Sequence, residues 1–366
     1  MVDTGLRIRK RRLPSGQNVS LSLALSIILL VLGIDISLNV NLTYSLLIPL
    51  FVCVLGVIAL GSVAVPILRQ LKTGQIVRED GPQAHLKKAG TPTMGGIFII
   101  PVGIAAALVF SGFEPRVAAC CILTLAFGLV GWLDDWQILR RHSNKGISPK
   151  TKLALQAICA IAFCTWMGLT QDWQSFSSVH LPLQLVLPLG ILFCPLAIFV
   201  IMGTTNATNL TDGLDGLAGG TGAIALLGMA MLLFPEQPQL AIFSACMSGS
   251  YLGFLWFNRN PASVFMGDTG SLALGGALAA VALLGNMLWG LLIVGAIFVW
   301  ESISVIAQVS YFKATKRSTG VGQRLFKMAP FHHHLELSGW HEIHVVRAFY
   351  IVGVMLVIFA LMLKFL

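Results

Sequence analysis

Residues 44–69 read YSLLIPLFVCVLGVIALGSVAVPILR and carry no charged side chain before Arg69. A helix needs an apolar run of about this length to cross the hydrocarbon core of a bilayer. The run is continuous and does not alternate between apolar and polar residues, which favours a helix over a strand of a membrane barrel. This segment therefore predicts a transmembrane helix.

Ten further apolar segments repeat this character along the chain. They lie at about 21–38, 94–112, 117–133, 152–170, 185–204, 217–234, 238–257, 270–285, 287–309 and 345–364. The sequence predicts an all-α polytopic membrane protein with about ten core transmembrane helices and an extra one near the N-terminus. We divide it into residues 1–40, a basic arm with the extra apolar segment, and residues 41–366, the main transmembrane domain.

The composition excludes three other classes of protein. Charged residues make up 11% of the 366 residues and hydrophobic residues 56%, whereas a soluble domain carries about 25% charged residues. Such a chain is too apolar to be a soluble globule or a disordered segment. The seven cysteines are odd in number and lie mostly in apolar runs, which indicates small core residues and not a secreted disulfide framework.

The N-terminal arm leaves one alternative open. Its basic residues precede the weakest apolar run, 21–38, which carries Asp35 near its end. A basic stretch followed by an apolar run is also typical of a cleaved signal peptide. No clear cleavage site follows, so a retained helix is favoured.

The distribution of Lys and Arg predicts the orientation. If the polar connections are assigned alternately to the two sides, all of the 24 basic residues except Arg116 and Lys364 fall on the side of the N-terminal arm. Loops rich in Lys and Arg stay in the cytoplasm, so we expect a multi-pass protein of the plasma (inner) membrane. The net charge of +9 follows from this topology and needs no nucleic-acid partner. It also suits an anionic substrate that approaches from the cytoplasm.

The first polar motif on that side is KAGTPTMGG, residues 88–96. Its glycines allow a ligand to approach the backbone, and Lys88 and Thr93 add a charge and a hydroxyl. If a helix begins near Met94, its free N–H groups favour phosphate at the same place. A simple helix-entry turn remains the alternative.

A pair of acids ends the apolar segment 117–133. Asp134 and Asp135 lie in GWLDDW, where two adjacent carboxylates repel each other and oppose the dipole of a helix C-terminus. Such pairs bind hard cations or accept protons. The alternative is a polar helix end that faces water.

A third motif, NATNLTDGLDGLAGG, covers residues 206–220. Asn209, Asp212 and Asp215 are three residues apart, so in a helix they share one face. Acids at the membrane edge mark ion or substrate sites by default. A solvated loop with Asx turns is the alternative.

The fourth motif is NPASVFMGDTGSLALGG, residues 260–276. Asp268 lies between Gly267 and Gly270, so one carboxylate can hold Mg²⁺ and leave room for water and phosphate ligands. Phe265 can stack on a base, although a lone Phe more often packs in a core.

The last motif, MAPFHHHLELSGWHE, covers residues 328–342. Its successive histidines, His332, His333 and His334, cannot all point the same way, so one should face the site and one should pack elsewhere. We favour a phosphate-facing or structural loop over a zinc site, which requires more fixed ligand spacing. Glu301, within an apolar segment, is interpreted as a buried acid hydrogen-bonded between helices.

Together, these five motifs resemble the polyprenyl-phosphate N-acetylhexosamine-1-phosphate transferases, from about residue 70 to the C-terminus. GTPTMGG and PFHHH are similar to the branch of that family that uses UDP-MurNAc-pentapeptide. The chain departs from the ten-helix family pattern by its first 40 residues and by a longer stretch between Gln308 and Met328. Neither departure touches a motif.

The resemblance implies that undecaprenyl phosphate attacks the β-phosphorus of UDP-MurNAc-pentapeptide, giving lipid I and UMP with Mg²⁺ as cofactor. The lipid bilayer and a second copy of the chain, in a homodimer, are the other expected partners of this transferase domain. It implies that Asp134, Asp135 and Asp268 are catalytic and that Asp268 binds the metal. The residues that it places on the nucleotide side are Lys88, Thr93, Asn209, Asp212, Asp215, Phe265, Gly267 and Gln308. His332, His333 and His334 are expected near the phosphates or the sugar.

Two rival functions remain open from the sequence. A related enzyme that uses UDP-GlcNAc differs only in the sugar pocket, for which the histidine loop is the discriminating feature. A transporter is the other rival. It would place its charged residues near the middle of the bilayer, in two related halves, whereas here the acids collect at one surface.

Overall fold

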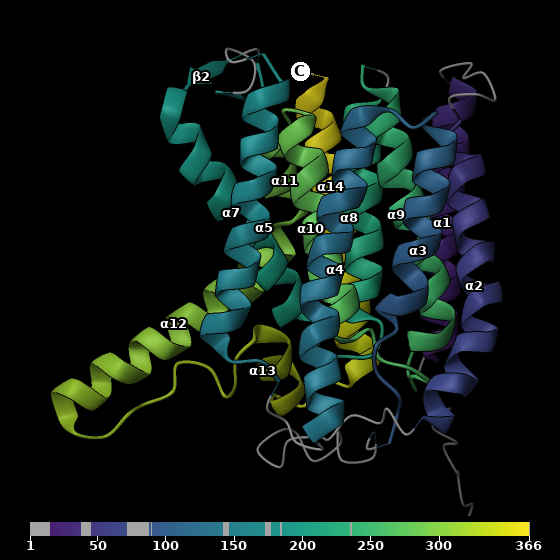
Figure 1. The fold of residues 1–366 in the computed structure, drawn as a ribbon. Coiled ribbons are helices and arrows are strands. Elements are labelled where there is room, and N and C mark those ends of the chain that lie inside the picture. Colours follow the sequence, from purple (N-terminus) through teal and green to yellow (C-terminus); the bar gives the residue numbers. More distant parts are fainter. Residues whose placement is uncertain are drawn as a thin grey trace, which may run out of the picture.

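The computed structural model is a bundle of helices whose axes are mostly aligned, parallel or antiparallel to one another (Figure 1). It describes residues 15–37, 45–71, 88, 90–141, 146–172, 177–183, 185–234 and 236–365. The long helices are α1 (Gly16–Ser37), α2 (Leu47–Gln70), α3 (Gly96–Phe110), α4 (Pro115–Arg141), α5 (Pro149–Thr170), α7 (Phe193–Thr211), α8 (Leu217–Leu233), α9 (Pro238–Asn258), α10 (Gly267–Leu284), α12 (Ala296–Thr319) and α14 (Glu342–Lys364). The short elements are β1 (Ser178–His180), β2 (Val186–Pro188), η3 (Gly190–Leu192), α11 (Leu288–Val294) and α13 (Phe331–Leu337).

The helices confirm a multi-pass membrane protein. Among the described residues, 7 helices are long and apolar enough to cross a membrane, or 8 if the bent pair α11 and α12 forms one span. Every apolar segment predicted from the sequence contains a helix. The ten predicted core spans are reached only if the shorter apolar helices α3 and α8 also cross, so that number stays a prediction.

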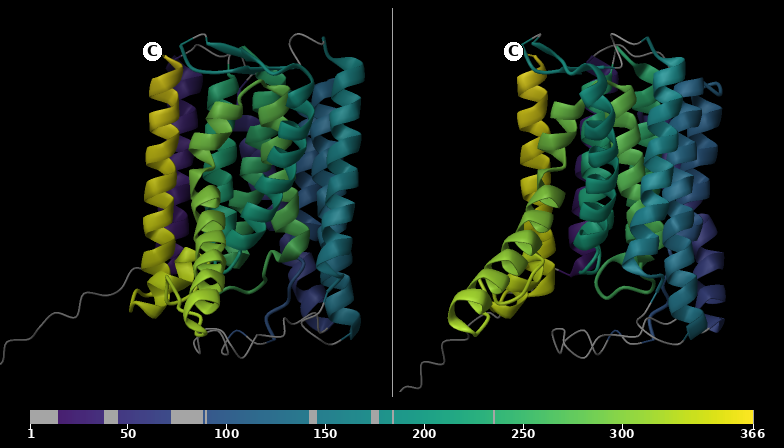
Figure 2. Two further views of the ribbon diagram at one scale, coloured as in Figure 1. Left: turned by 90° about the vertical axis from the view of Figure 1, so that its left-hand side faces the viewer. Right: turned by 60° about the vertical axis from the view of Figure 1, so that its left-hand side comes forward.

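Helix α1 lies where the extra N-terminal apolar segment was expected. It is a 22-residue helix that contacts α2, α8, α9 and α14 and runs along the bundle (Figure 2). Whether it spans the membrane stays a prediction, as does the division of the chain at residue 40. The basic arm, residues 1–14, lies outside the described residues.

Two predicted spans differ in detail from straight helices. Segment 185–204 begins with β2, which pairs antiparallel with β1, and its helix starts only at Phe193. Segment 287–309 is broken at Gly295, where α11 and α12 meet at 71°. Helix α12 then leans out of the bundle (Figure 2).

Helices α8, α9 and α10 form the centre of the bundle. Every residue of α8 is buried, and α9 and α10 are buried over most of their length. Small residues on these helices let neighbouring backbones approach closely. Helix α7 is joined to this centre by a hydrogen bond, in which the Thr208 hydroxyl donates to the Ser271 carbonyl of α10 at 2.8 Å. This contact fixes the N-terminal end of α10 against α7.

The polar motifs gather at one end of the bundle. The connections after α4, α7, α9 and α12 all lie there, whereas the β1–β2 hairpin and the C-terminus lie at the other end (Figure 1). Arg116 and Lys364 lie near the hairpin end, paired with Glu114 at 2.9 Å and Glu236 at 2.6 Å. The described helices therefore alternate in the way that the charge analysis assumed, and the side that faces the cytoplasm stays a prediction.

Candidate functional site

Asp268, in the first turn of α10, is the centre of the candidate site. Its Oδ1 accepts a hydrogen bond from Asn209 Nδ2 at 2.8 Å, and its Oδ2 is ion-paired with Lys152 Nζ. The Asp268 side chain is 24% exposed. Helices α10, α7 and α5 thus bring a carboxylate, an amide and an ammonium together at a position that solvent reaches.

Asp135 binds the N-terminus of α10 from outside that helix. Its Oδ1 accepts the backbone N–H of Asp268 at 3.1 Å, and its Oδ2 accepts the N–H and the hydroxyl of Thr269 at 2.9 and 2.6 Å. The side chain is buried. A carboxylate at a helix N-terminus satisfies free N–H groups and interacts favourably with the helix dipole. Asp135 therefore caps the helix that presents Asp268.

Gly267 is required by this arrangement. Its φ is +72°, and a Cβ would lie 2.6 Å from Asp135 Oδ2 and 2.9 Å from Thr93 Oγ1. Thr93, which the sequence predicted as a site residue, is buried next to this turn. Gly267 and Thr93 are thus part of the packing around the start of α10.

Asp134 lies on the other side of the Asp268 carboxylate. Its Oδ1 accepts the backbone N–H of Ile147 at 3.0 Å, and its charge acts on both Asp268 and Lys152. The structure thus brings Asp134, Asp135 and Asp268 close enough for their charges to act on one another.

Lys152 is a site residue that the sequence analysis did not single out. It was counted there only among the 24 basic residues that predict the orientation. A lysine in the first turn of a helix opposes the helix dipole, and this unfavourable position, between Pro149 and the apolar segment, was the available signal. In the structure its ammonium faces Asp268, Asp134 and Asp135.

The predicted acidic face of the third motif is divided between two places. Helix α7 ends at Thr211, so Asn209, Asp212 and Asp215 do not form one helical stripe as the helical interpretation assumed. Asp212 remains close to the Asp268 cluster: burial, followed by the charges on Asp268, Asp135 and Asp215, raises the pKa of its carboxyl to about 8.

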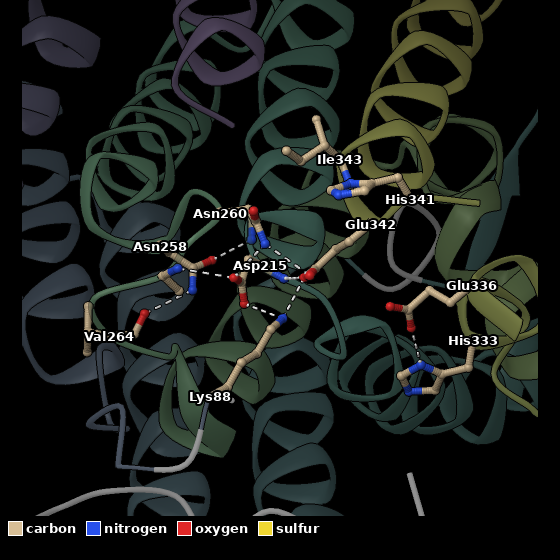
Figure 3. A network of polar contacts seen from close by, with 12 residues as sticks. Lys88, Asp215, Asn258, Asn260, Val264, His333, Glu336, His341, Glu342 and Ile343 are labelled. Atoms are coloured by element: carbon tan, nitrogen blue, oxygen red, sulfur yellow. Dashed lines mark hydrogen bonds and ion pairs between the residues drawn. The ribbon is translucent and has the colours of Figure 1, made fainter. Parts of the chain in front are cut away.

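Asp215 belongs to a second network, which contains Lys88, Glu342 and Asn260 (Figure 3). Lys88 Nζ is 2.8 Å from Asp215 Oδ1 and 2.6 Å from Glu342 Oε1. Asn260 Nδ2 donates to Asp215 Oδ2 at 3.1 Å and to Glu342 Oε2 at 3.0 Å. Burial lowers the pKa of Lys88, but the two carboxylates outweigh it and hold that pKa above its ordinary value. Sequence reasoning missed Glu342 and Asn260.

The three histidines point in different directions, as expected. His332 is fully buried, and its Nδ1 lies 3.1 Å from Oε2 of the equally buried Glu301. This confirms that Glu301 is a buried acid hydrogen-bonded between helices. His333 Nδ1 lies 2.9 Å from Glu336 Oε2. His334 Nδ1 accepts the backbone N–H of Lys327 at 3.2 Å.

The remaining predicted residues hold loops together. Phe265 donates its N–H to the Pro92 carbonyl at 2.8 Å and accepts the Gly95 N–H at 2.9 Å, which joins the first motif to the fourth. Gln308 Oε1 accepts the N–H groups of Leu325 and Phe326 at 3.1 and 2.8 Å.

The donor set around Asp268 fits magnesium. Among the described residues, no group of three or more His, Cys, Asp and Glu side chains is arranged as a metal site. Mg²⁺ needs no such cage, because it takes one or two carboxylates and fills its other positions with water and phosphate. The exposed part of Asp268 and its pairing with a cation, Lys152, are compatible with that chemistry.

Comparisons with known proteins show the family to which the chain belongs. A signature described as phospho-N-acetylmuramoyl-pentapeptide-transferase signature 1 matches residues 88–100. A protein from Trichormus variabilis, named phospho-N-acetylmuramoyl-pentapeptide-transferase, is 57% identical to this chain over 318 residues. The match covers 87% of this chain and 86% of the relative. The chain belongs to the phospho-N-acetylmuramoyl-pentapeptide-transferase family.

Further matches extend this family membership. The relative of the same name from Nostoc punctiforme is 59% identical, covering 85% of this chain and 86% of its own. That from Synechococcus elongatus is 55% identical, covering 79% and 80%. Glycosyl transferase family 4 matches residues 117–286, the segment from α4 to the end of α10. The predicted family and enzyme class are confirmed.

Proposed function

We propose that this enzyme transfers phospho-MurNAc-pentapeptide from UDP-MurNAc-pentapeptide to undecaprenyl phosphate, giving lipid I and UMP in peptidoglycan synthesis. The observation that carries the proposal is the Asp268 cluster at one end of the membrane bundle, in a chain that is 57% identical to a family member. The family signature, residues 88–100, packs on the start of α10 through the contacts of Phe265.

Asp268 is proposed to hold Mg²⁺, with the diphosphate oxygens and water as the other ligands, while Asn209 orients this carboxylate through its hydrogen bond. When bound, this ion would neutralise charge on the diphosphate and on the departing UMP. Lys152, ion-paired with Asp268, is free to turn to a substrate phosphate once the carboxylate binds a cation. It therefore joins the proposed site as an anion-binding residue.

The two adjacent acids are proposed to have different roles. Asp134 orients the acceptor phosphate or takes its residual proton, because its described backbone partner, Ile147, contacts only one of its oxygens. Both oxygens of Asp135 accept hydrogen bonds from Asp268 and Thr269. Asp135 therefore positions the metal-binding turn and does not touch the acceptor.

The remaining predicted residues are proposed to line the donor substrate. Their contacts separate three groups: residues next to the start of α10, the Lys88 network, and residues of α12 and α13. The full set is Lys88, Thr93, Asn209, Asp212, Asp215, Phe265, Gly267, Gln308, His332, His333 and His334. For His332, which is fully buried, we propose an indirect role: it helps to shape the segment around α13 that carries the other two histidines.

The site is proposed to face the cytoplasm, because the charge analysis of the sequence assigns all Lys and Arg residues except Arg116 and Lys364 to its side of the membrane. A cysteine placed at Ser15, just before α1, should not react with an impermeant reagent in intact cells. Labelling of that cysteine would contradict the orientation or the spanning of α1.

The function is tested with the purified full-length protein in detergent. UDP-MurNAc-pentapeptide, a polyprenyl phosphate and Mg²⁺ should together give UMP, and omission of the polyprenyl phosphate or of Mg²⁺ should abolish its release. UDP-GlcNAc in place of the donor is the control for specificity. If UMP were released with UDP-GlcNAc as the donor but not with UDP-MurNAc-pentapeptide, the proposal would be overturned in favour of the related enzyme.

A further inference from the structure

Glu342, the first residue of α14, joins three segments that are far apart in the chain (Figure 3). Its Oε1 lies 2.6 Å from Lys88 Nζ and accepts the backbone N–H of Asp215 at 2.8 Å. Its Oε2 accepts Asn260 Nδ2 at 3.0 Å. One carboxylate thus contacts the first motif, the third motif and the loop before α10.

The position of Glu342 is itself stabilised. A carboxylate in the first turn of a helix interacts favourably with the helix dipole. Only 12% of the Glu342 side chain is exposed, and 17% of Lys88. A largely buried carboxylate at a helix end is a more rigid anchor for an ammonium than a surface ion pair, which is mobile and screened.

Lys88 begins the loop that reaches the metal-binding turn. Its carbonyl accepts the N–H of Thr91 at 3.1 Å, and Pro92 and Gly95 then bond to Phe265. The place of Lys88 therefore sets the start of a loop that contacts Phe265, two residues before Gly267. Because Asp215 alone would leave the ammonium with one anionic partner, the second carboxylate decides how firmly that start is held.

We propose that Glu342 is a positioning residue that holds Lys88 in place for the nucleotide substrate. The inference rests on the proposed function, because it assumes that Lys88 binds the UDP-linked donor. Asp215 and Glu342 are the charged groups that act on Lys88 among the described residues. Burial opposes the charge of Lys88, so removal of one carboxylate should lower the pKa of its ammonium.

Three variants of the full-length protein test the proposal. Glu342→Gln keeps the size of the side chain and removes its charge, and Glu342→Asp keeps the charge. Glu236→Gln is the matched control, because Glu236 pairs with Lys364 at the opposite end of the molecule and is 62% exposed. Thermal unfolding of each purified variant in detergent shows whether it is folded.

Two readouts are measured. The first is the KM for UDP-MurNAc-pentapeptide and the kcat of UMP release. The second is the pH dependence of acetylation of Lys88 by acetic anhydride, followed by mass spectrometry, with the exposed Lys313 as internal reference. The labelling measurement needs no substrate.

For Glu342→Gln we expect KM to rise about tenfold, the scale of one charge-assisted hydrogen bond, with kcat within about twofold of the wild type. The labelling pKa of Lys88 should fall by about one to three units. Glu342→Asp should recover most of both values, and Glu236→Gln should match the wild type.

An unchanged labelling pKa of Lys88 in Glu342→Gln would overturn the inference, as would an unchanged KM in the folded variant. A wild-type protein that releases no UMP would contradict the proposed function instead. The labelling comparison would then still decide whether Glu342 sets the charge and position of Lys88.

Discussion

The carboxylate of Asp135 accepts the backbone N–H of Asp268 at 3.1 Å, so two acids from separate motifs are joined by a hydrogen bond from side chain to main chain. Asp135 also accepts two hydrogen bonds from Thr269. Asp135 thus fixes the start of α10, and the partly exposed Asp268 carboxylate faces the proposed site. Asp134, the neighbour of Asp135, instead accepts the backbone N–H of Ile147.

Replacement of Asp135 should therefore affect folding as well as activity. In Asp135→Asn, the amide group keeps one acceptor oxygen and turns N–H groups toward the donors of Asp268 or Thr269. A buried donor left without a partner costs about 1–3 kcal/mol, so the thermal midpoint should fall together with UMP release.

Asp134→Asn is the matched comparison. Its remaining oxygen can still accept the Ile147 N–H, so the thermal midpoint should stay near that of the wild type while UMP release falls. Equal thermal midpoints for the two variants would contradict the capping role of Asp135.

Replacement of Asp268 tests the metal site. Asp268→Asn keeps the size of the side chain and removes the charge that would hold Mg²⁺ against phosphate. We expect UMP release to fall by at least about 10²-fold, the scale of one strong electrostatic contact in a transition state. The partly exposed side chain predicts that the fold survives. Near-normal turnover at ordinary Mg²⁺ concentrations would refute the assignment.

Substitution of Gly267 separates the effect of close packing from the effect of backbone strain. Gly267→Ala places a Cβ 2.6 Å from Asp135 Oδ2, so the start of α10 must shift and UMP release should fall at least tenfold, which corresponds to about 1.4 kcal/mol in the barrier. Gly320→Ala is the control, since Gly320 has a similar φ of +78° with open space around it. Comparable losses in both variants would attribute the effect to backbone strain alone.

The sequence predicted the helical membrane fold well because its apolar runs are long and continuous. It also predicted that Asp134, Asp135 and Asp268 lie on one side of the membrane, because all three residues end or begin apolar segments there. It did not predict Lys152 or Glu342, whose roles depend on which way a side chain turns at a helix end. Nor did it predict the bend at Gly295, since composition continues unchanged across the break.

Asp212 predicts a pH dependence of substrate binding. Its carboxyl has a raised pKa of about 8, from burial and then from the charges on Asp268, Asp135 and Asp215. It therefore carries a proton below pH 8 and is anionic above it, where it repels the donor diphosphate. At fixed Mg²⁺, the KM for UDP-MurNAc-pentapeptide should rise as the pH passes through 8.

Asp212→Asn cannot ionise, so its KM should match that of the wild type near pH 7 and remain level between pH 7 and 9. The pKa of Lys88 lies above its ordinary value, so Lys88 stays charged over this range and does not produce the same limb. A rise of KM in Asp212→Asn equal to that in the wild type would refute the role of Asp212.

The reaction should proceed by a single displacement without a phospho-enzyme. The second pKa of a phosphate monoester is about 6, so the acceptor is largely a dianion at neutral pH and needs positioning more than covalent activation. The carboxylate of Asp268 is already held by Lys152 and Asn209, and as a nucleophile it would lose its proposed metal-binding role as UMP leaves. The two-step alternative is tested by isotope exchange with delipidated enzyme, labelled UMP and UDP-MurNAc-pentapeptide, in the absence of polyprenyl phosphate. We expect no label in the nucleotide sugar, whereas rapid exchange that survives exhaustive removal of lipid would establish a covalent intermediate.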